Sequence, residues 1–171
     1  EKTAVHILTS TIEGLMQPRV ENQVRKLDTL IQALEEKMKG LLTDDAEFDL
    51  ENLAEGGDQK LKVKDEDKAA FEMCHKAVKE LKELRWRYTE GPSGRGRSHM
   101  AMTNSTGCSS VWGSTYPYNP YPFPWVNHLF QDAPSIAIGV FEGQMRKMGD
   151  NFISVRRAEL LLSDEYDETT H

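Results

Sequence analysis

The chain has 171 residues, of which 38% are hydrophobic and 29% charged, and it carries a formal net charge of −7 at pH 7. This length and composition are typical of a globular domain with a real core, whereas the acidic balance argues against a general nucleic-acid binder, whose binding surface is basic. No apolar run approaches the roughly 20 residues of a membrane span, no signal peptide opens the chain and two cysteines make no disulfide framework, so we expect a cytoplasmic protein that binds neither membranes nor nucleic acid.

The first apolar pattern indicates a helix. Four apolar residues recur at helical spacing over residues 2–16: Val5, Leu8, Ile12 and Leu15. Pro18 follows, and the residue before a proline is biased away from helical dihedral angles. We therefore expect the helix to be interrupted at Gln17-Pro18.

Two longer apolar seams predict a helical hairpin. The first repeats at spacings of 4-3-4-3-4-3: Val20, Val24, Leu27, Ile31, Leu34, Met38 and Leu41. The second repeats at spacings of 4-3-4-3-4: Ala70, Cys74, Ala77, Leu81, Leu84 and Tyr88. A single helix would leave its stripe in water, so we expect the two helices to bury each other in antiparallel order. Within the second seam we expect Cys74 to be a small buried side chain rather than a ligand or nucleophile.

The connections on either side of the second seam differ in charge. Residues 43–67 are acidic, but their carboxylates do not fit the spacing of an EF-hand loop, which favours a solvated linker. Residues 91–97 form a basic, glycine-rich loop without a phosphate-loop motif. We expect this loop to be a hinge; the alternative is that Arg95 or Arg97 meets an anionic group on a substrate, cofactor or partner chain.

The most informative stretch runs from Met102 to Asp132. Its prolines at positions 117, 120, 122 and 124 rule out a helix there and favour extended, polyproline-like backbone. A strand expected over residues 100–104 leads directly into T-G-C-S-S, where backbone amides and two serines could stabilise a thiolate at Cys108. Taken alone, Cys108 is more simply interpreted as a free or buried thiol, and one cysteine cannot hold a 4Fe–4S cluster, which normally takes four thiolates.

Two further helices are expected after this stretch. Asp132 suits the cap of the first helix. One face of that helix carries four residues: Ile136, Val140, Gly143 and Lys147. Gly139 and Gly143, four positions apart, would permit close packing against a neighbour. A last, shorter helix is expected from Phe152 onward.

The order of motifs resembles the thiamine-diphosphate-binding domain of pyruvate:ferredoxin oxidoreductase and related 2-oxoacid:ferredoxin oxidoreductases. In that family a strand ends in A/S-T-G-C-S-S-I/V-W/Y-G, and a loop then leads to P-A-W-x-N-S-L-F-E-D-A. This chain reads N-S-T-G-C-S-S-V-W-G and then P-W-V-N-H-L-F-Q-D-A. Glu1-Lys2-Thr3 also resembles the sequence that follows the family's C-x-G-C-G. The resemblance covers about 16 residues at the start of the chain and about 45 residues from Met100 onward, and the hairpin shows none.

This resemblance implies a helix-rich α/β fragment of a thiamine-diphosphate-binding fold. Residues 1–17 and 98–171 would form part of that domain, and residues 18–97 would be an inserted antiparallel helical hairpin with an acidic connection. Cys108 would ligate a 4Fe–4S cluster and lie against thiamine diphosphate, and Glu1 would contact the same cofactor. The remaining thiolates and the magnesium motif G-D-G would come from the rest of a large oxidoreductase chain or its subunits, so the fragment alone would be inactive.

The implied reaction is the oxidative decarboxylation of a 2-oxoacid to acyl-CoA, with electrons passed through iron–sulfur clusters to ferredoxin or flavodoxin. The hairpin and the Pro-Tyr run over residues 116–124 depart from the family pattern. An alternative of another class is a non-enzymatic coiled-coil interaction module, whose hairpin docks a partner helix and whose Pro-Tyr run is a polyproline-type ligand.

Overall fold

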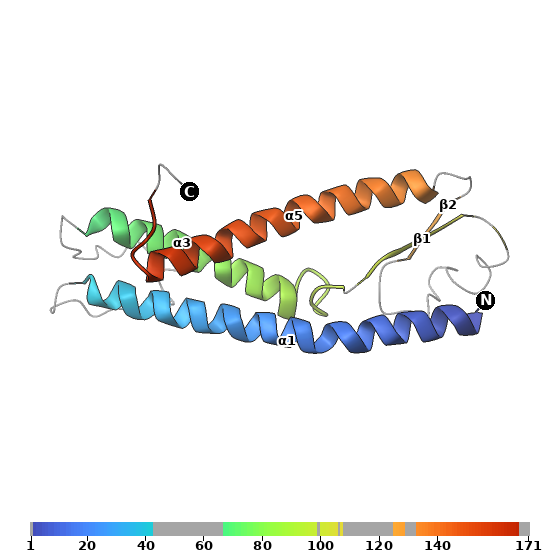
Figure 1. Cartoon of the computed structure of the whole chain (residues 1–171), viewed down its shortest axis with the longest axis horizontal. Coiled ribbons are helices and arrows are strands. Elements are labelled where there is room, and N and C mark those ends of the chain that lie inside the picture. Colours follow the sequence, from blue (N-terminus) through green and yellow to red (C-terminus); the bar gives the residue numbers. More distant parts are fainter. Residues whose placement is uncertain are drawn as a thin grey trace. The chain divides into compact units, whose positions relative to one another are not determined.

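The computed structural model describes residues 2–42, 67–98, 100–105, 107, 125–128 and 133–167 (Figure 1). Their elements are α1 (Lys2–Gly40), α3 (Lys68–Thr89), β1 (Met102–Ser105), β2 (Trp125–His128) and α5 (Ala133–Leu162). This part of the chain is rich in helix with little strand, as the sequence predicted. The contacts divide the chain into two compact units, unit 1 (Glu1–Gln23 and Tyr88–Gly149) and unit 2 (Val24–Arg87 and Asp150–His171). The assignment of residues 18–97 as an insertion into a thiamine-diphosphate-binding domain stays a prediction.

The helix α1 runs through Pro18, so the predicted interruption there is wrong. A proline inside a helix lacks one hydrogen-bonding N–H and crowds the carbonyl four residues earlier, at a cost of about 3 kcal/mol. Here that carbonyl belongs to Gly14, and both Gly14 and Pro18 are exposed. Water can satisfy the carbonyl, so the proline weakens the helix locally without ending it.

Unit 2 is built on the predicted seams. Four residues of the first seam and four of the second are buried: Leu27, Ile31, Leu34, Met38, Cys74, Ala77, Leu81 and Leu84. The end of α5 completes this core, which the sequence did not predict, with four more buried residues: Val155, Ala158, Leu160 and Leu161. The hairpin helices therefore bury each other and a third helix.

Ion pairs define the direction of the hairpin. Asp28 pairs with Arg85, and Glu35 pairs with Lys82 at 2.8 Å. Residue numbers rise on α1 as they fall on α3, so the two helices are antiparallel, as predicted (Figure 1). These side chains are partly exposed, and such pairs contribute about 0–1 kcal/mol each, so they fix register more than stability.

The end of α5 is joined to both hairpin helices. Glu80 of α3 accepts a hydrogen bond from Ser154 Oγ at 2.8 Å and pairs with Arg157 at 3.3 Å. Lys26 of α1 pairs with Glu159 at 2.7 Å. All of these residues lie within unit 2, so polar contacts join the end of α5 to both α1 and α3 beside the apolar core.

The carboxyl end of α5 is closed by a Schellman-type cap. Asp164 adopts the left-handed conformation, with φ of 57°, and the N–H of Glu165 donates to the carbonyl of Leu160 at 3.1 Å. Lys37 of α1 donates to the carbonyl of Leu161 and pairs with Asp164. One lysine therefore satisfies a free carbonyl at a helix end and holds the turn that follows it.

In unit 1, β1 and β2 pair in parallel, with Met102 opposite Trp125 and Ser105 opposite His128. The strand at residues 102–105 confirms the predicted strand to within two residues, whereas β2 was not predicted. The two helices expected after residue 132 form one continuous helix, α5, so their predicted separation is wrong. Among the described helices, none combines the length and the low polarity needed to cross a membrane.

Candidate functional site

The parallel pairing of β1 and β2 brings two motif-bearing segments of the chain to one edge. The last residues of the strands, Ser105 and His128, are register partners. In the sequence, Ser105 is followed at once by T-G-C-S-S, and His128 is followed by L-F-Q-D-A. The carboxyl ends of parallel strands are where α/β proteins place their ligands. The backbone geometry of this edge therefore suits a binding site.

The two residues predicted to bind cofactors lie outside the described residues. Glu1 precedes the described start of α1, and Cys108 follows Gly107, which is described and exposed. A Cβ added at Gly107 would meet no atom within 4 Å, so this glycine has open space beside it. Within the described residues, no group of three or more His, Cys, Asp or Glu side chains could hold a metal ion.

Cys74, the other cysteine, is a core residue. Its side chain is 1% exposed and packs in unit 2. Burial raises the pKa of the Cys74 thiol, while the positive charge of Lys37 opposes this shift and the negative charge of Asp164 adds to it. A neutral, enclosed thiol is a poor nucleophile and metal ligand, which confirms the prediction of a structural role.

The glycine-rich loop after α3 is folded back on the end of that helix. Gly91, Gly94 and Gly96 all have positive φ, and the N–H of Gly96 donates to the carbonyl of Glu90 at 2.6 Å. Arg97 lies over the ring of Tyr88 and also donates to its hydroxyl. Of the two arginines considered as anion ligands, Arg97 is therefore engaged within the loop, and anion binding by Arg95 stays a prediction.

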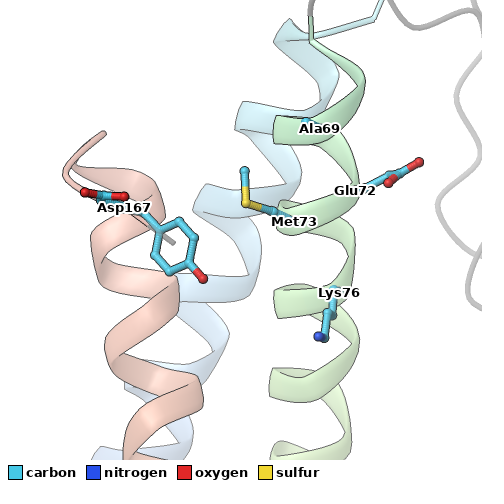
Figure 2. Close-up of a pocket in the computed structure, with 6 residues that line it drawn as sticks. Ala69, Glu72, Met73, Lys76 and Asp167 are labelled. Carbon is cyan, nitrogen blue, oxygen red and sulfur yellow. The ribbon is translucent and has the colours of Figure 1, made fainter. Parts of the chain in front are cut away.

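A surface groove of about 470 Å³ lies in unit 2, between α3 and the residues that follow α5. Six residues line it: Ala69, Glu72, Met73, Lys76, Tyr166 and Asp167. Figure 2 shows Met73 extending from α3 toward the segment that carries Asp167, while Glu72 points away from that segment. Ala69, Met73 and Tyr166 give the groove apolar surface, and its other three residues are charged. These six residues include no nucleophile paired with a base.

The first half of α5, in which every residue from Ile138 to Asp150 is exposed, carries an apolar seam that the predicted helical face did not include. Four large apolar residues repeat at spacings of 3-4-3: Ile138, Phe141, Met145 and Met148. They are between 44% and 67% exposed. The same 3-4 spacing that predicted the hairpin is present here. The packing face predicted from the sequence instead lay on another side of the helix, near Gly139 and Gly143.

Parts of the chain are similar to oxidoreductases that act on pyruvate. The chain is 36% identical over 69 residues to pyruvate dehydrogenase (NADP(+)) of Cryptosporidium parvum, a match that covers 36% of this chain and 4% of that protein. It is 37% identical over 48 residues to pyruvate synthase subunit PorB of Methanosarcina barkeri, which covers 28% of this chain and 16% of the subunit. It is also 37% identical over 51 residues to pyruvate-flavodoxin oxidoreductase of Klebsiella pneumoniae, which covers 26% of this chain and 4% of that enzyme.

The similarity is partial on both sides. The chain spans between 4% and 16% of the length of these relatives. No protein-family model matches the chain, and no solved structure matches it. These matches support the predicted resemblance at the level of pyruvate oxidoreductases.

Proposed function

We propose that the chain is a segment of a 2-oxoacid oxidoreductase that oxidatively decarboxylates a pyruvate-type substrate to acyl-CoA. The partial similarity to three pyruvate oxidoreductases supports this proposal, together with the T-G-C-S-S and P-W-V-N-H-L-F motifs. The names of these relatives refer to NADP(+) in one case and to flavodoxin in another. The shared feature is pyruvate, and transfer of electrons to ferredoxin or flavodoxin is the expectation from the motifs.

The observation that carries the proposal is the parallel pairing of β1 with β2. Parallel strands occur almost entirely in α/β folds with helices on both faces, so a parallel pair is expected to belong to a larger sheet. The register places Ser105 beside His128, so the backbone enters both motifs from neighbouring positions. A thiamine-diphosphate-binding α/β domain accounts for both features.

Within this proposal, Cys108 is a ligand of a 4Fe–4S cluster and borders thiamine diphosphate, and Glu1 contacts that cofactor. When bound, thiamine diphosphate would supply the carbanion chemistry of decarboxylation, and the cluster would accept single electrons. Cys74 is enclosed in the core of unit 2, so this chain offers at most one thiolate to a cluster. The other ligands, the magnesium ion's motif and the coenzyme A site are assigned to the rest of the oxidoreductase.

The structure does not favour the alternative of a coiled-coil interaction module. That function requires an apolar seam on the hairpin that is open to a partner helix. Leu27, Leu34 and Leu81 are each 0% exposed, because α3 and the end of α5 already cover the seam. The Pro-Tyr run, the other part of that alternative, lies outside the described residues.

The test is to express the complete reading frame that contains this segment and to purify its product under anaerobic conditions. Iron, acid-labile sulfide and bound thiamine diphosphate are then measured on that product. We expect Cys108→Ser to lower the iron content by the equivalent of about one cluster, about four iron atoms. Cys74→Ser is the matched control, because it removes the other thiol of the segment and should leave the iron content unchanged. Equal iron in the wild-type protein and Cys108→Ser would remove Cys108 from the proposed site.

A further inference from the structure

The seam on the first half of α5 presents four large apolar side chains to water. Ile138 and Phe141 are 67% and 61% exposed, and Met145 and Met148 are 48% and 44% exposed. A partner that covered all four side chains would remove their apolar surface from water, and this removal is the main driving force of most protein association. Contiguous apolar patches of this kind mark interaction surfaces.

The residues beside the seam carry almost no charge. At 100° per residue, Ala137, Gln144 and Gly149 flank the seam and complete a sector of about 140° without an ionisable side chain. The charged residues of this half of α5 lie outside the sector: Glu142, Arg146, Lys147 and Asp150. The uncharged side of the helix is therefore broad.

The width of this sector distinguishes two kinds of partner. Helices that pair as coiled coils usually carry charged residues at the positions that flank the seam. Here the four flanking positions are Ala137, Glu142, Gln144 and Gly149, and Glu142 is the only charged residue among them. A broad uncharged face fits burial against the interior of a larger fold better than a narrow contact with a second copy of the chain.

We propose that the sector centred on Phe141 and Met145 docks against an apolar face supplied by the remainder of the oxidoreductase polypeptide. This inference rests on the proposed function. The matched parts of this chain cover between 4% and 16% of the relatives, so the relatives are about six to twenty-five times as long as the parts that match. The longer polypeptide supplies the apolar cover that the seam lacks. The seam is then an internal packing surface of the enzyme.

Methionine oxidation tests this proposal without any substitution. Hydrogen peroxide converts exposed methionine to the sulfoxide, and peptide mass spectrometry measures each site separately. In the 171-residue chain we expect Met145 and Met148 to react at least about tenfold faster than Met38, which is 0% exposed and serves as the internal control. In the product of the complete reading frame, with any subunits that copurify, we expect Met145 and Met148 to react within about twofold of Met38.

Several results would overturn the proposal. Met145 and Met148 could stay as reactive in the complete product as in this chain, or the reading frame could hold no further polypeptide. Protection in the 171-residue chain that disappears on dilution would assign the surface to a second copy instead. Iron and thiamine diphosphate measured on the same sample keep the two proposals apart: protected methionines without iron defeat the proposed function, whereas reactive methionines in an iron-containing enzyme defeat the docking surface.

Discussion

The guanidinium of Arg97 lies over the ring of Tyr88, 5.4 Å from its centroid, and Nη1 of the same arginine donates to the Tyr88 hydroxyl at 2.9 Å. The N–H of Arg97 also donates to the carbonyl of Tyr88 at 3.4 Å. The chain that leaves α3 is thus held against the last turn of the helix by contacts to one residue. The glycine-rich connection is therefore a hydrogen-bonded turn at the end of α3, and its role as a hinge stays a prediction.

Gly96→Ala should destabilise this turn strongly. A Cβ at position 96 would lie 2.3 Å from the carbonyl oxygen of Tyr88, and its φ of +73° is strained for any residue with a side chain. We expect a loss of about 2–3 kcal/mol or more in the free energy of unfolding, measured by urea denaturation. Gly94→Ala is the matched control, because φ there is +67° but nothing lies within 4 Å of the added carbon, so it should cost only about 1 kcal/mol. Equal effects of the two substitutions would show that the contact with Tyr88 does not matter.

Leu81→Ala should lower the stability of unit 2. Leu81 is 0% exposed, and removal of its side chain leaves a cavity among the three helices. We expect a loss of about 2–5 kcal/mol in urea denaturation followed by circular dichroism. Leu15→Ala, at a position that is 63% exposed, should change stability by less than about 0.5 kcal/mol. A small effect at Leu81 would contradict the buried seam.

The cap of α5 makes opposite predictions for two substitutions of Asp164. Alanine disfavours the left-handed conformation of this residue, so Asp164→Ala should cost about 1 kcal/mol in free energy of unfolding. Asp164→Gly should match or exceed the wild type, because glycine suits this conformation. Both variants lose the ion pair with Lys37, but the Asp164 side chain is 83% exposed, so that pair should contribute little. Equal destabilisation by both substitutions would show that the ion pair, rather than the backbone conformation, stabilises the cap.

Glu159 should make part of the stability of unit 2 depend on pH. The hydrogen bond from Lys26 lowers the pKa of this carboxyl, against partial desolvation, and Arg156 lowers it further. Because the folded pKa lies below the unfolded value of about 4.3, this stabilisation is present above that pH and is lost as the pH falls through the folded pKa. We expect Glu159→Gln to cost less than about 1 kcal/mol at pH 7, and the difference from wild type to shrink between about pH 5 and pH 3.

Lys26→Gln is the partner variant for this prediction. In a Lys26→Gln background, Glu159→Gln should have a smaller effect at pH 7, because the main cause of the lowered pKa is gone. An unchanged effect would assign the stabilisation to another neighbour of Glu159.

Local periodicity predicted the hairpin, because apolar residues at alternating spacings of four and three fall on one side of a helix. Leu27 and Leu34 of α1 and Leu81 of α3 belong to such seams, and all three are buried. It did not predict that Val155 and Ala158 would complete the same core, because the choice of a third helix depends on contacts between distant parts of the chain. β2 was missed for the same reason: its four residues have no alternating pattern, and the parallel pairing with β1 is a long-range contact.

The candidate site was predicted from motifs rather than from periodicity. In the described residues, Ser105 and His128 are register partners, so the backbone leads into the two motifs from adjacent strand ends. They do not include Glu1 or Cys108, whose roles stay predictions. The exposed seam of α5 was readable from its 3-4-3 spacing, but a helical pattern alone cannot say whether a partner covers it.

The way unit 2 is assembled limits how the hairpin could be removed. Val155, Ala158 and Leu161 belong to α5 and not to the hairpin, yet they are buried in the core that the hairpin completes. Replacing residues 24–87 by a short turn would expose these side chains to water and leave an aggregation-prone apolar surface at the end of α5. A chain shortened in this way would therefore need polar replacements on α5 as well, so the hairpin and the end of α5 form one structural unit.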